Sequence, residues 1–154
     1  MIIIELKERE GISENVKLAR IYTQFQELLK ELRKRELPEK IIDVVNQKIE
    51  GLNSIILTGN ELGKLVKQKQ TEIIKLLEKE LKIVPKNHYR NLWLVLGMSV
   101  FGLPIGVVYG VILNNMGMLA IGLPIGMAIG IGLGAVLDKK AVKEGRQLEM
   151  EIQY

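Results

Sequence analysis

Residues 91–137 read NLWLVLGMSVFGLPIGVVYGVILNNMGMLAIGLPIGMAIGIGLGAVL, and this stretch contains no Asp, Glu, Lys, Arg or His. An α-helix needs about 20 apolar residues to cross the roughly 30 Å core of a bilayer. The stretch is long enough for two such helices, at 92–113 and 118–137, separated by the turn-forming residues NNMG at 114–117. It therefore predicts an antiparallel two-helix transmembrane hairpin over 91–137. The alternative, a soluble core, would require this chain of 154 residues to bury helices that are apolar all round.

Glycines recur every fourth residue in both predicted helices, because the word GLPIG occurs at 102–106 and again at 122–126. The predicted helix-packing residues are Gly102, Gly106, Gly110, Gly122, Gly126 and Gly130. Such spacing lines one helix face with bare backbone, which a second helix can approach closely in lipid. In a hairpin that turns near residue 116, three pairs of these glycines are predicted to lie at equal depth in the membrane: 102 with 130, 106 with 126, and 110 with 122. The helix that packs against each glycine face is either the other helix of the same hairpin or a helix of a neighbouring subunit.

A proline lies in the middle of each predicted helix, at Pro104 and Pro124. Proline has no backbone N–H and clashes with the carbonyl four residues earlier, so it kinks or bends a helix. In lipid an unpaired carbonyl costs several kcal/mol, to order of magnitude, unless another group satisfies it. The two prolines are therefore predicted as bends, either static or acting as hinges.

Basic and aromatic residues flank the uncharged stretch and predict its orientation. The predicted membrane-interface residues are Lys86, His88, Tyr89, Arg90, Trp93, Lys139 and Lys140. Positive flanks favour the cytoplasmic side of a membrane. Residues 85–90 and the tail at 138–154 are thus expected in the cytoplasm with both termini, and the turn at 114–117 on the opposite side.

Residues 1–84 predict about three amphipathic helices, at 13–36, 38–57 and 60–84. Apolar residues recur there at intervals of three and four, Ser13 and Asn60 are candidate caps, and Pro38 suits a first helical turn. These helices form an N-terminal bundle or a coiled-coil-like oligomerisation module. The whole chain is therefore predicted to be all-α, with a cytoplasmic helical domain followed by the hairpin.

The composition argues against an enzyme, a cofactor and a metal site. The chain has no cysteine and one histidine, and it has neither a phosphate-binding glycine loop nor a Glu-x-x-His pair. Its 22 basic and 18 acidic residues are well mixed outside the hairpin, which argues against nucleic acid as a partner. Proton rotors and coupled transporters normally need an ionisable residue within the membrane, and residues 91–137 have none.

The region from about 85 to 147 resembles bacterial glycine-zipper proteins with a two-helix transmembrane hairpin. The resemblance rests on YRNLW (89–93), the doubled GLPIG and LDKKAVKEGRQL (137–148). It implies a hairpin in the bacterial cytoplasmic membrane that self-associates, and it implies no established activity. Residues 1–84 show no such resemblance.

Two functions from different classes fit these observations. In the first, the glycine faces assemble homo-oligomers into a pore or channel that the cytoplasmic helices assemble or gate, as in membrane-disrupting effectors of bacterial defence or toxin systems. In the second, the hairpin is an anchor in the lipid bilayer, and the N-terminal helices recruit a cytoplasmic protein partner. The lack of polar lining in 91–137 favours the anchor, whereas the paired glycine faces and prolines favour the assembly. The sequence therefore predicts the self-associating assembly as the function, with the anchor as the alternative.

Overall fold

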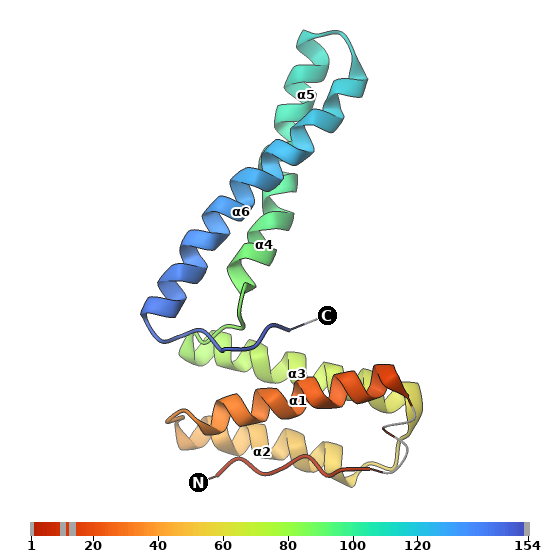
Figure 1. Ribbon diagram of the computed structural model, residues 1–154, viewed down its shortest axis with the longest axis vertical. Coiled ribbons are helices and arrows are strands. Elements are labelled where there is room, and N and C mark those ends of the chain that lie inside the picture. The colour runs from red at the N-terminus through yellow and green to blue at the C-terminus, as the bar shows by residue number, and fades with distance from the viewer. Residues whose placement is uncertain (1, 10–11, 13–14, 153–154) are drawn as a thin grey trace. The chain divides into compact units, whose positions relative to one another are not determined.

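The computed structural model describes residues 2–9, 12 and 15–152, and the regular secondary structure in these residues is helical (Figure 1). This confirms the all-α prediction. The chain forms two compact units. The helical unit consists of Met1–Val84 and Leu148–Tyr154, and the hairpin unit consists of Pro85–Gln147.

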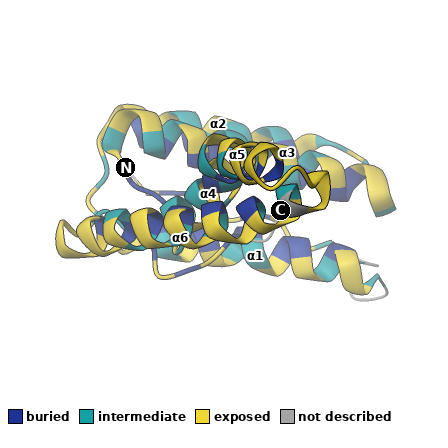
Figure 2. Ribbon diagram, turned by 90° about the horizontal axis from the view of Figure 1, so that it is seen from above, coloured by how far each residue is buried: buried dark blue, intermediate teal, exposed yellow. Residues whose placement is uncertain are grey.

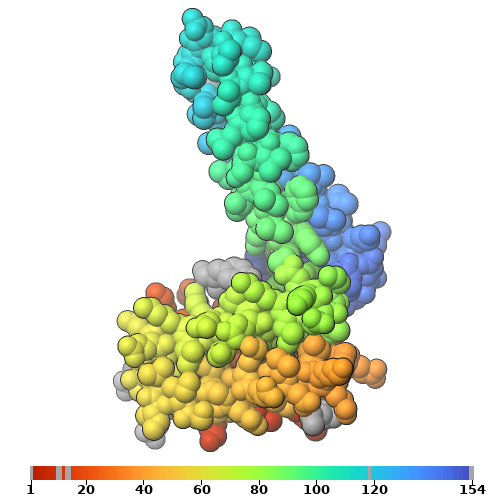
Figure 3. All heavy atoms as spheres, turned by 180° about the vertical axis from the view of Figure 1, so that it is seen from behind, coloured from red at the N-terminus to blue at the C-terminus, as the bar shows by residue number. Residues whose placement is uncertain are grey.

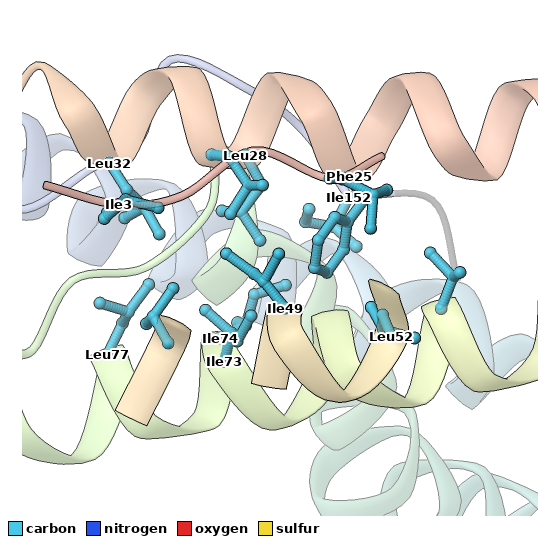
Figure 4. Packing of buried hydrophobic residues seen from close by; sticks show 14 of the residues in the cluster. Ile3, Phe25, Leu28, Leu32, Ile49, Leu52, Ile73, Ile74, Leu77 and Ile152 are labelled. Atoms are coloured by element: carbon cyan, nitrogen blue, oxygen red, sulfur yellow. The ribbon is translucent and has the colours of Figure 1, made fainter. Parts of the chain in front are cut away.

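Three helices build the helical unit: α1 (Val16–Arg33), α2 (Glu39–Ser54) and α3 (Gly59–Leu81). The apolar stripes predicted from the sequence face its core. In the first helix, seven apolar residues that recur at intervals of three and four are buried: Leu18, Ile21, Tyr22, Phe25, Leu28, Leu29 and Leu32. The core of α2 and α3 includes Val45, Ile49, Leu52, Val66, Ile73 and Leu77 (Figure 4). The spacing of apolar residues therefore identified which side of each helix is buried.

The helix ends differ from the predicted ones. Ser13 lies outside the described residues, and the side chain of Asn15 caps α1 by accepting hydrogen bonds from the backbone N–H groups of Lys17 and Leu18. Helix α2 ends at Ser54 rather than at residue 57, and Ile56 beyond it is 96% exposed. Helix α3 begins at Gly59 rather than after a cap at Asn60, and it ends at Leu81 instead of continuing to Val84.

Two extended segments complete the core of the helical unit. Ile3 and Leu6 come from the start of the chain, and Leu148, Met150 and Ile152 come from its end. Figure 4 shows Ile3 and Ile152 among the side chains of the helices. The backbone N–H of Leu148 donates to the carbonyl of Val84 at 2.9 Å. The last residues of the predicted tail at 138–154 are therefore part of the helical unit.

The hairpin unit has two legs. The first runs through α4 (His88–Gly97), a π-helical turn η1 (Met98–Gly102) and α5 (Leu103–Ile112). A 3₁₀ turn η2 (Met116–Met118) leads into the second leg, α6 (Leu119–Lys143). Within the connection, Asn115 accepts a hydrogen bond from the N–H of Gly117 at 3.0 Å. Both legs extend beyond the uncharged stretch at their charged ends.

Candidate functional site

The six predicted helix-packing glycines are buried, and five of them lie between the two legs of the hairpin. A Cβ atom built on Gly126 would lie 2.5 Å from the Cα of Gly102, and one on Gly122 would lie 2.6 Å from the Cα of Gly106. Real Cβ atoms essentially never approach other atoms within 3.0 Å. Glycine is therefore required for the legs to approach this closely, and its partner surface lies within the same hairpin.

Gly110 differs from the other five glycines because it lies beside the connection. A Cβ on Gly110 would be 3.4 Å from the Sδ of Met116, which is an ordinary contact distance. The carbonyl of Gly110 accepts a hydrogen bond from the N–H of Asn115 at 3.0 Å. This position therefore supports the return of the chain rather than the close contact of the legs.

The glycines of the two legs interdigitate, and the predicted pairing at equal depths is wrong. Gly122 lies against both Gly102 and Gly106, while Gly126 lies against Gly97 and Gly102. The offset is already present at the start of α6, where Gly106 packs against the backbone of Leu119. An offset places the ridge of one helix in the groove of the other, as helices generally pack.

Two further glycines, Gly97 and Gly134, belong to this contact although the sequence analysis assigned them no role. A Cβ on Gly97 would lie 2.8 Å from the Cα of Gly130, and one on Gly134 would lie 2.5 Å from the Cα of Arg90. We call the seven closely packed residues the glycine seam: Gly97, Gly102, Gly106, Gly122, Gly126, Gly130 and Gly134. The sequence feature that could have identified Gly134 is its position four residues after Gly130, which continues the four-residue spacing.

The π-helical turn η1 brings Gly97 into the seam. Gly97 precedes Gly102 by five residues, which is out of phase with the four-residue spacing in an α-helix. In η1 the N–H of Leu103 donates to the carbonyl of Met98, five residues earlier. This wider turn accommodates the extra residue and returns Gly102 to the same face as Gly97.

The two prolines have different surroundings. Pro104 is exposed in the first turn of α5, directly after η1. Pro124 is exposed inside α6, which continues as an α-helix on both sides of it. The change of helix type is therefore confined to the first leg, where it comes just before the residue that lacks a backbone donor.

Asp138 joins the two legs at their charged end. Its carboxylate is buried and accepts hydrogen bonds from the N–H groups of Tyr89 at 3.1 Å and Arg90 at 2.9 Å. These N–H groups belong to the first turn of α4, where helices leave donors without intrahelical partners. The N-cap residue Asn87 makes no side-chain cap hydrogen bond, so the cap comes from α6. The sequence analysis missed this role of Asp138.

The predicted interface residues gather at this same end of the hairpin, since Tyr89 and Arg90 adjoin Gly134 and Asp138. The rings of His88 and Tyr89 meet edge to face, with centroids 5.1 Å apart. Lys86, Arg90, Lys139 and Lys140 are exposed, and Trp93 is partly buried.

Just beyond α6, the hydrogen bond from Arg146 lowers the pKa of the Glu144 carboxyl.

The outer surface of the hairpin is apolar. Exposed residues of its legs include Val95, Val100, Val107, Val111, Ile121, Ile125, Ile129, Leu133 and Val136. The exposed faces of α5 and α6 are yellow in Figure 2, and Figure 3 shows the outside of the first leg from green to cyan. His88–Ile112 and Leu119–Lys143 are long and apolar enough to cross a membrane, and only 22% of the apolar window in each is buried.

The described residues contain no cluster of three or more His, Cys, Asp or Glu side chains that could hold a metal ion. In comparisons with known proteins, the chain matches no family model, no curated protein and no solved structure.

Proposed function

We propose that residues 85–147 cross a lipid bilayer as a helical hairpin, and that this hairpin anchors a helical unit that recruits a partner protein. The observation that carries the proposal is the distribution of residues across the hairpin. Its inside is glycine backbone, and its outside is branched aliphatic side chains. A soluble protein would bury these aliphatic side chains in its core, whereas a bilayer solvates them directly.

The charged residues support a cytoplasmic location for both ends of the hairpin. Basic residues precede α4 and end α6, whereas the connection from Leu113 to Met118 has no charge. Basic flanks stay on the cytoplasmic side of bacterial membranes. The chain re-enters the helical unit at Leu148, whose N–H is bonded to Val84, so both ends of the hairpin are on one side. The resemblance to bacterial hairpin proteins agrees with the bacterial cytoplasmic membrane.

An anchor fits the glycine seam better than an assembly through glycine faces. The seven glycines of the seam already pack against the opposite leg, so they are not available to a second subunit. The legs also offer little polar lining for an aqueous path. A homo-oligomeric pore is the second candidate, which the π-helical turn before Pro104 favours, because such turns are frequent at functional sites.

Cysteine labelling tests the proposal, since the chain has no cysteine of its own. We would express Asn115→Cys, in the connection, and Ser54→Cys, exposed on the helical unit, in bacteria and treat intact cells with a membrane-impermeant maleimide. We expect label on residue 115 in intact cells and on residue 54 only after lysis. Protein in the soluble fraction, or equal labelling at both positions before lysis, would refute a spanning hairpin.

The mass of the protein in detergent separates the anchor from the pore. An anchor is expected as a monomer and causes no dye release from liposomes. A defined oligomer together with dye release would establish the second candidate instead. Substitutions in the seam cannot decide this question, because they would disturb the fold of the hairpin itself.

A further inference from the structure

The start of the chain lies in an extended conformation across the helical unit, held through its backbone by helix side chains. We call residues 2–9 the N-terminal segment. The side-chain carbonyl of Asn46 accepts from the N–H of Ile4 at 3.0 Å, and its amide donates to the carbonyl of Ile2 at 3.1 Å. Asn53 repeats this pattern with the N–H of Lys7 at 2.9 Å and the carbonyl of Glu5 at 3.0 Å.

The spacing of the two asparagines matches the repeat of an extended chain. Asn46 and Asn53 are seven residues apart on α2, which corresponds to a rise of about 10.5 Å. Each binds a carbonyl and the N–H two residues later, and the second set follows the first by three residues. Three residues of extended chain span about 10 Å. The two asparagines therefore bind the backbone of an extended chain, and these hydrogen bonds do not depend on the side chains of that chain.

Several side chains of the segment contact the helical unit: Ile4 packs against the core, and the Arg9 guanidinium donates to the carbonyls of Leu52 and Leu57. Ile3 and Leu6 are buried in the core. The carboxylate of Glu5 pairs with Arg33 of α1 at 3.0 Å, and the same guanidinium donates to the carbonyls of Ile3 and Ile4. The groove thus favours an extended peptide with two apolar residues three positions apart and a carboxylate just before the second.

The N-terminal segment does not fill the groove. A hollow of about 440 Å³ remains between this segment and α1, lined by Leu6, Leu29, Lys30 and Arg33 among others. Leu6 borders the hollow, but the residue is only 6% exposed and belongs to the hydrophobic core. The site is wider than the segment that occupies it.

We propose that the groove between α1 and α2 binds an extended peptide of a partner protein, and that the N-terminal segment is an internal placeholder for it. The proposed ligand carries apolar residues at the positions of Ile3 and Leu6 and an acidic residue at that of Glu5. This inference rests on the recruitment role proposed above and names the class of partner. Backbone hydrogen bonds give affinity and side-chain pockets give selectivity, as in other modes that bind extended peptides.

The covalent link sets the condition that a partner must meet. A tethered segment competes at an effective concentration on the order of millimolar. A peptide added in solution must therefore have a higher intrinsic affinity for the groove than the placeholder, or be present above this effective concentration. Otherwise the placeholder must be weakened first. Weakening the two apolar contacts of the placeholder should expose the groove while leaving Asn46, Asn53 and Arg33 intact.

Fluorescence anisotropy tests the proposal on the full chain in detergent. The probe is a labelled peptide, IIIELKER, which copies residues 2–9. We expect Ile3→Asp with Leu6→Asp to raise its affinity at least tenfold over the unaltered chain. Adding Asn46→Ala and Asn53→Ala to this variant should reduce binding at least tenfold, and a peptide with Asp at both apolar positions should not bind.

A second measurement uses the unaltered chain, in case the opened variant does not fold. Hydrogen exchange should show faster exchange of the Ile4 and Lys7 amides when the probe peptide is in excess, because it displaces the placeholder. Unchanged exchange at a saturating peptide concentration, or binding that ignores the asparagine substitutions, overturns the proposal. A dimer that dissociates on peptide addition also overturns it, because the occupant would then be a second copy of the chain.

This experiment is independent of the membrane proposal. Peptide binding takes place in detergent and does not require a spanning hairpin, whereas the cysteine labelling described above does not require the groove. Labelling as expected without peptide binding leaves an anchor without this recruitment site. If the peptide binds but the cysteine labelling does not give the expected pattern, the helical unit binds peptides and the hairpin does not span a membrane.

Discussion

Backbone atoms make the closest contacts along the glycine seam, so a single methyl group changes the distance between the legs. Gly130 faces the backbone of Trp93, where a Cβ would lie 2.8 Å from the carbonyl carbon, and the backbone of Gly97. Backbone cannot move aside as the end of a flexible side chain can. The legs themselves must separate, and the other contacts of the seam weaken with them.

Gly130→Ala should therefore destabilise the hairpin, and Gly132→Ala provides a matched control in the same helix. A Cβ on Gly132 would meet nothing within 4 Å. Both changes gain the same helix propensity, so the difference between them isolates overpacking, which costs about 1–3 kcal/mol. Thermal unfolding in detergent, followed by circular dichroism, should show a lower midpoint for Gly130→Ala alone. Equal midpoints would mean that the seam opens without cost.

Asp138 shows why some of the site could not be predicted from the sequence. It is the first charged residue after the uncharged stretch, and a boundary charge ordinarily indicates a solvated flank. Its role as a cap depends on the register of α6 against α4, which fixes its distance from the Tyr89 and Arg90 amides. That register follows from the connection and the seam, and no spacing near residue 138 encodes it.

The π-helical turn η1 allows the glycines of the two legs to pack together although their spacing along the chain differs. The second leg repeats every four residues, whereas the first begins with an interval of five. A deletion inside η1 would convert that interval to four, which a regular α-helix keeps on one face. Pro124 inside α6 shows that a proline in these legs does not require a π-helical turn.

Deletion of Ser99, in η1, should therefore be tolerated, whereas deletion of Ile105 should not. The second deletion rotates the glycines before it relative to those after it by about 100°, which splits the seam. We expect the unfolding midpoint in detergent to stay within about 3 °C for the first deletion and to fall by about 5 °C or more for the second. Similar losses for both would show that η1 has a role beyond keeping the glycines in phase.

Helices α2 and α3 are linked by an ion pair that predicts a pH dependence. Lys48 of α2 and Glu72 of α3 lie 2.6 Å apart. The hydrogen bond from Lys48, with smaller contributions from Gln68 and Lys69, lowers the pKa of Glu72 from 4.5 to about 2. A carboxyl whose pKa is lower in the folded state stabilises that state above its unfolded pKa, and this stabilisation is lost as the pH falls from about 4.5 to about 2.

Glu72→Gln should lower the free energy of unfolding at pH 7 by about 0.5–1 kcal/mol, a modest value because the side chain is a third exposed. The difference from the unaltered chain should shrink below pH 4.5 and disappear near pH 2. Denaturant unfolding at pH 7, 4 and 2.5 measures it, with Glu50→Gln on the exposed side of α2 as the control. A difference that is constant over this range would contradict the ionic origin.

The ends of the elements were less predictable than their buried faces. Gly59 at the start of α3 and Lys82 after its end both have positive φ, +59° and 57°. A left-handed residue directly after the last turn stops a helix there, as Lys82 does for α3, and lysine is not a usual signal for such a residue. The apolar spacing continues past Lys82 to Val84, so it predicted a longer helix than the one that forms.

For the whole molecule, the hairpin is an insertion in the helical unit rather than an extension of it. The first part of this unit ends at Val84, and its second part begins at Leu148. The uncharged stretch at 91–137 identified the hairpin from the sequence. The return of the chain was harder to see, although Leu148, Met150 and Ile152 alternate with polar residues in the way that half-buried extended segments do.

Because the tail is part of the core, a change in the last residues of the chain should destabilise a unit that consists mostly of the first 84. Leu148 is 1% exposed within this core, and truncating a buried leucine to alanine costs about 2–5 kcal/mol. Leu148→Ala should therefore lower the stability of the helical unit, and Glu149→Ala at the exposed neighbouring position should leave it nearly unchanged. Hydrogen exchange in detergent measures this effect through the protection of α1 and α3. Under Leu148→Ala that protection should fall while the protection of α6 is retained, because the seam of the hairpin is untouched. Unchanged protection in α1 and α3 would show that the three helices hold their core without the tail, and the hairpin would then be joined to the helical unit at one end only.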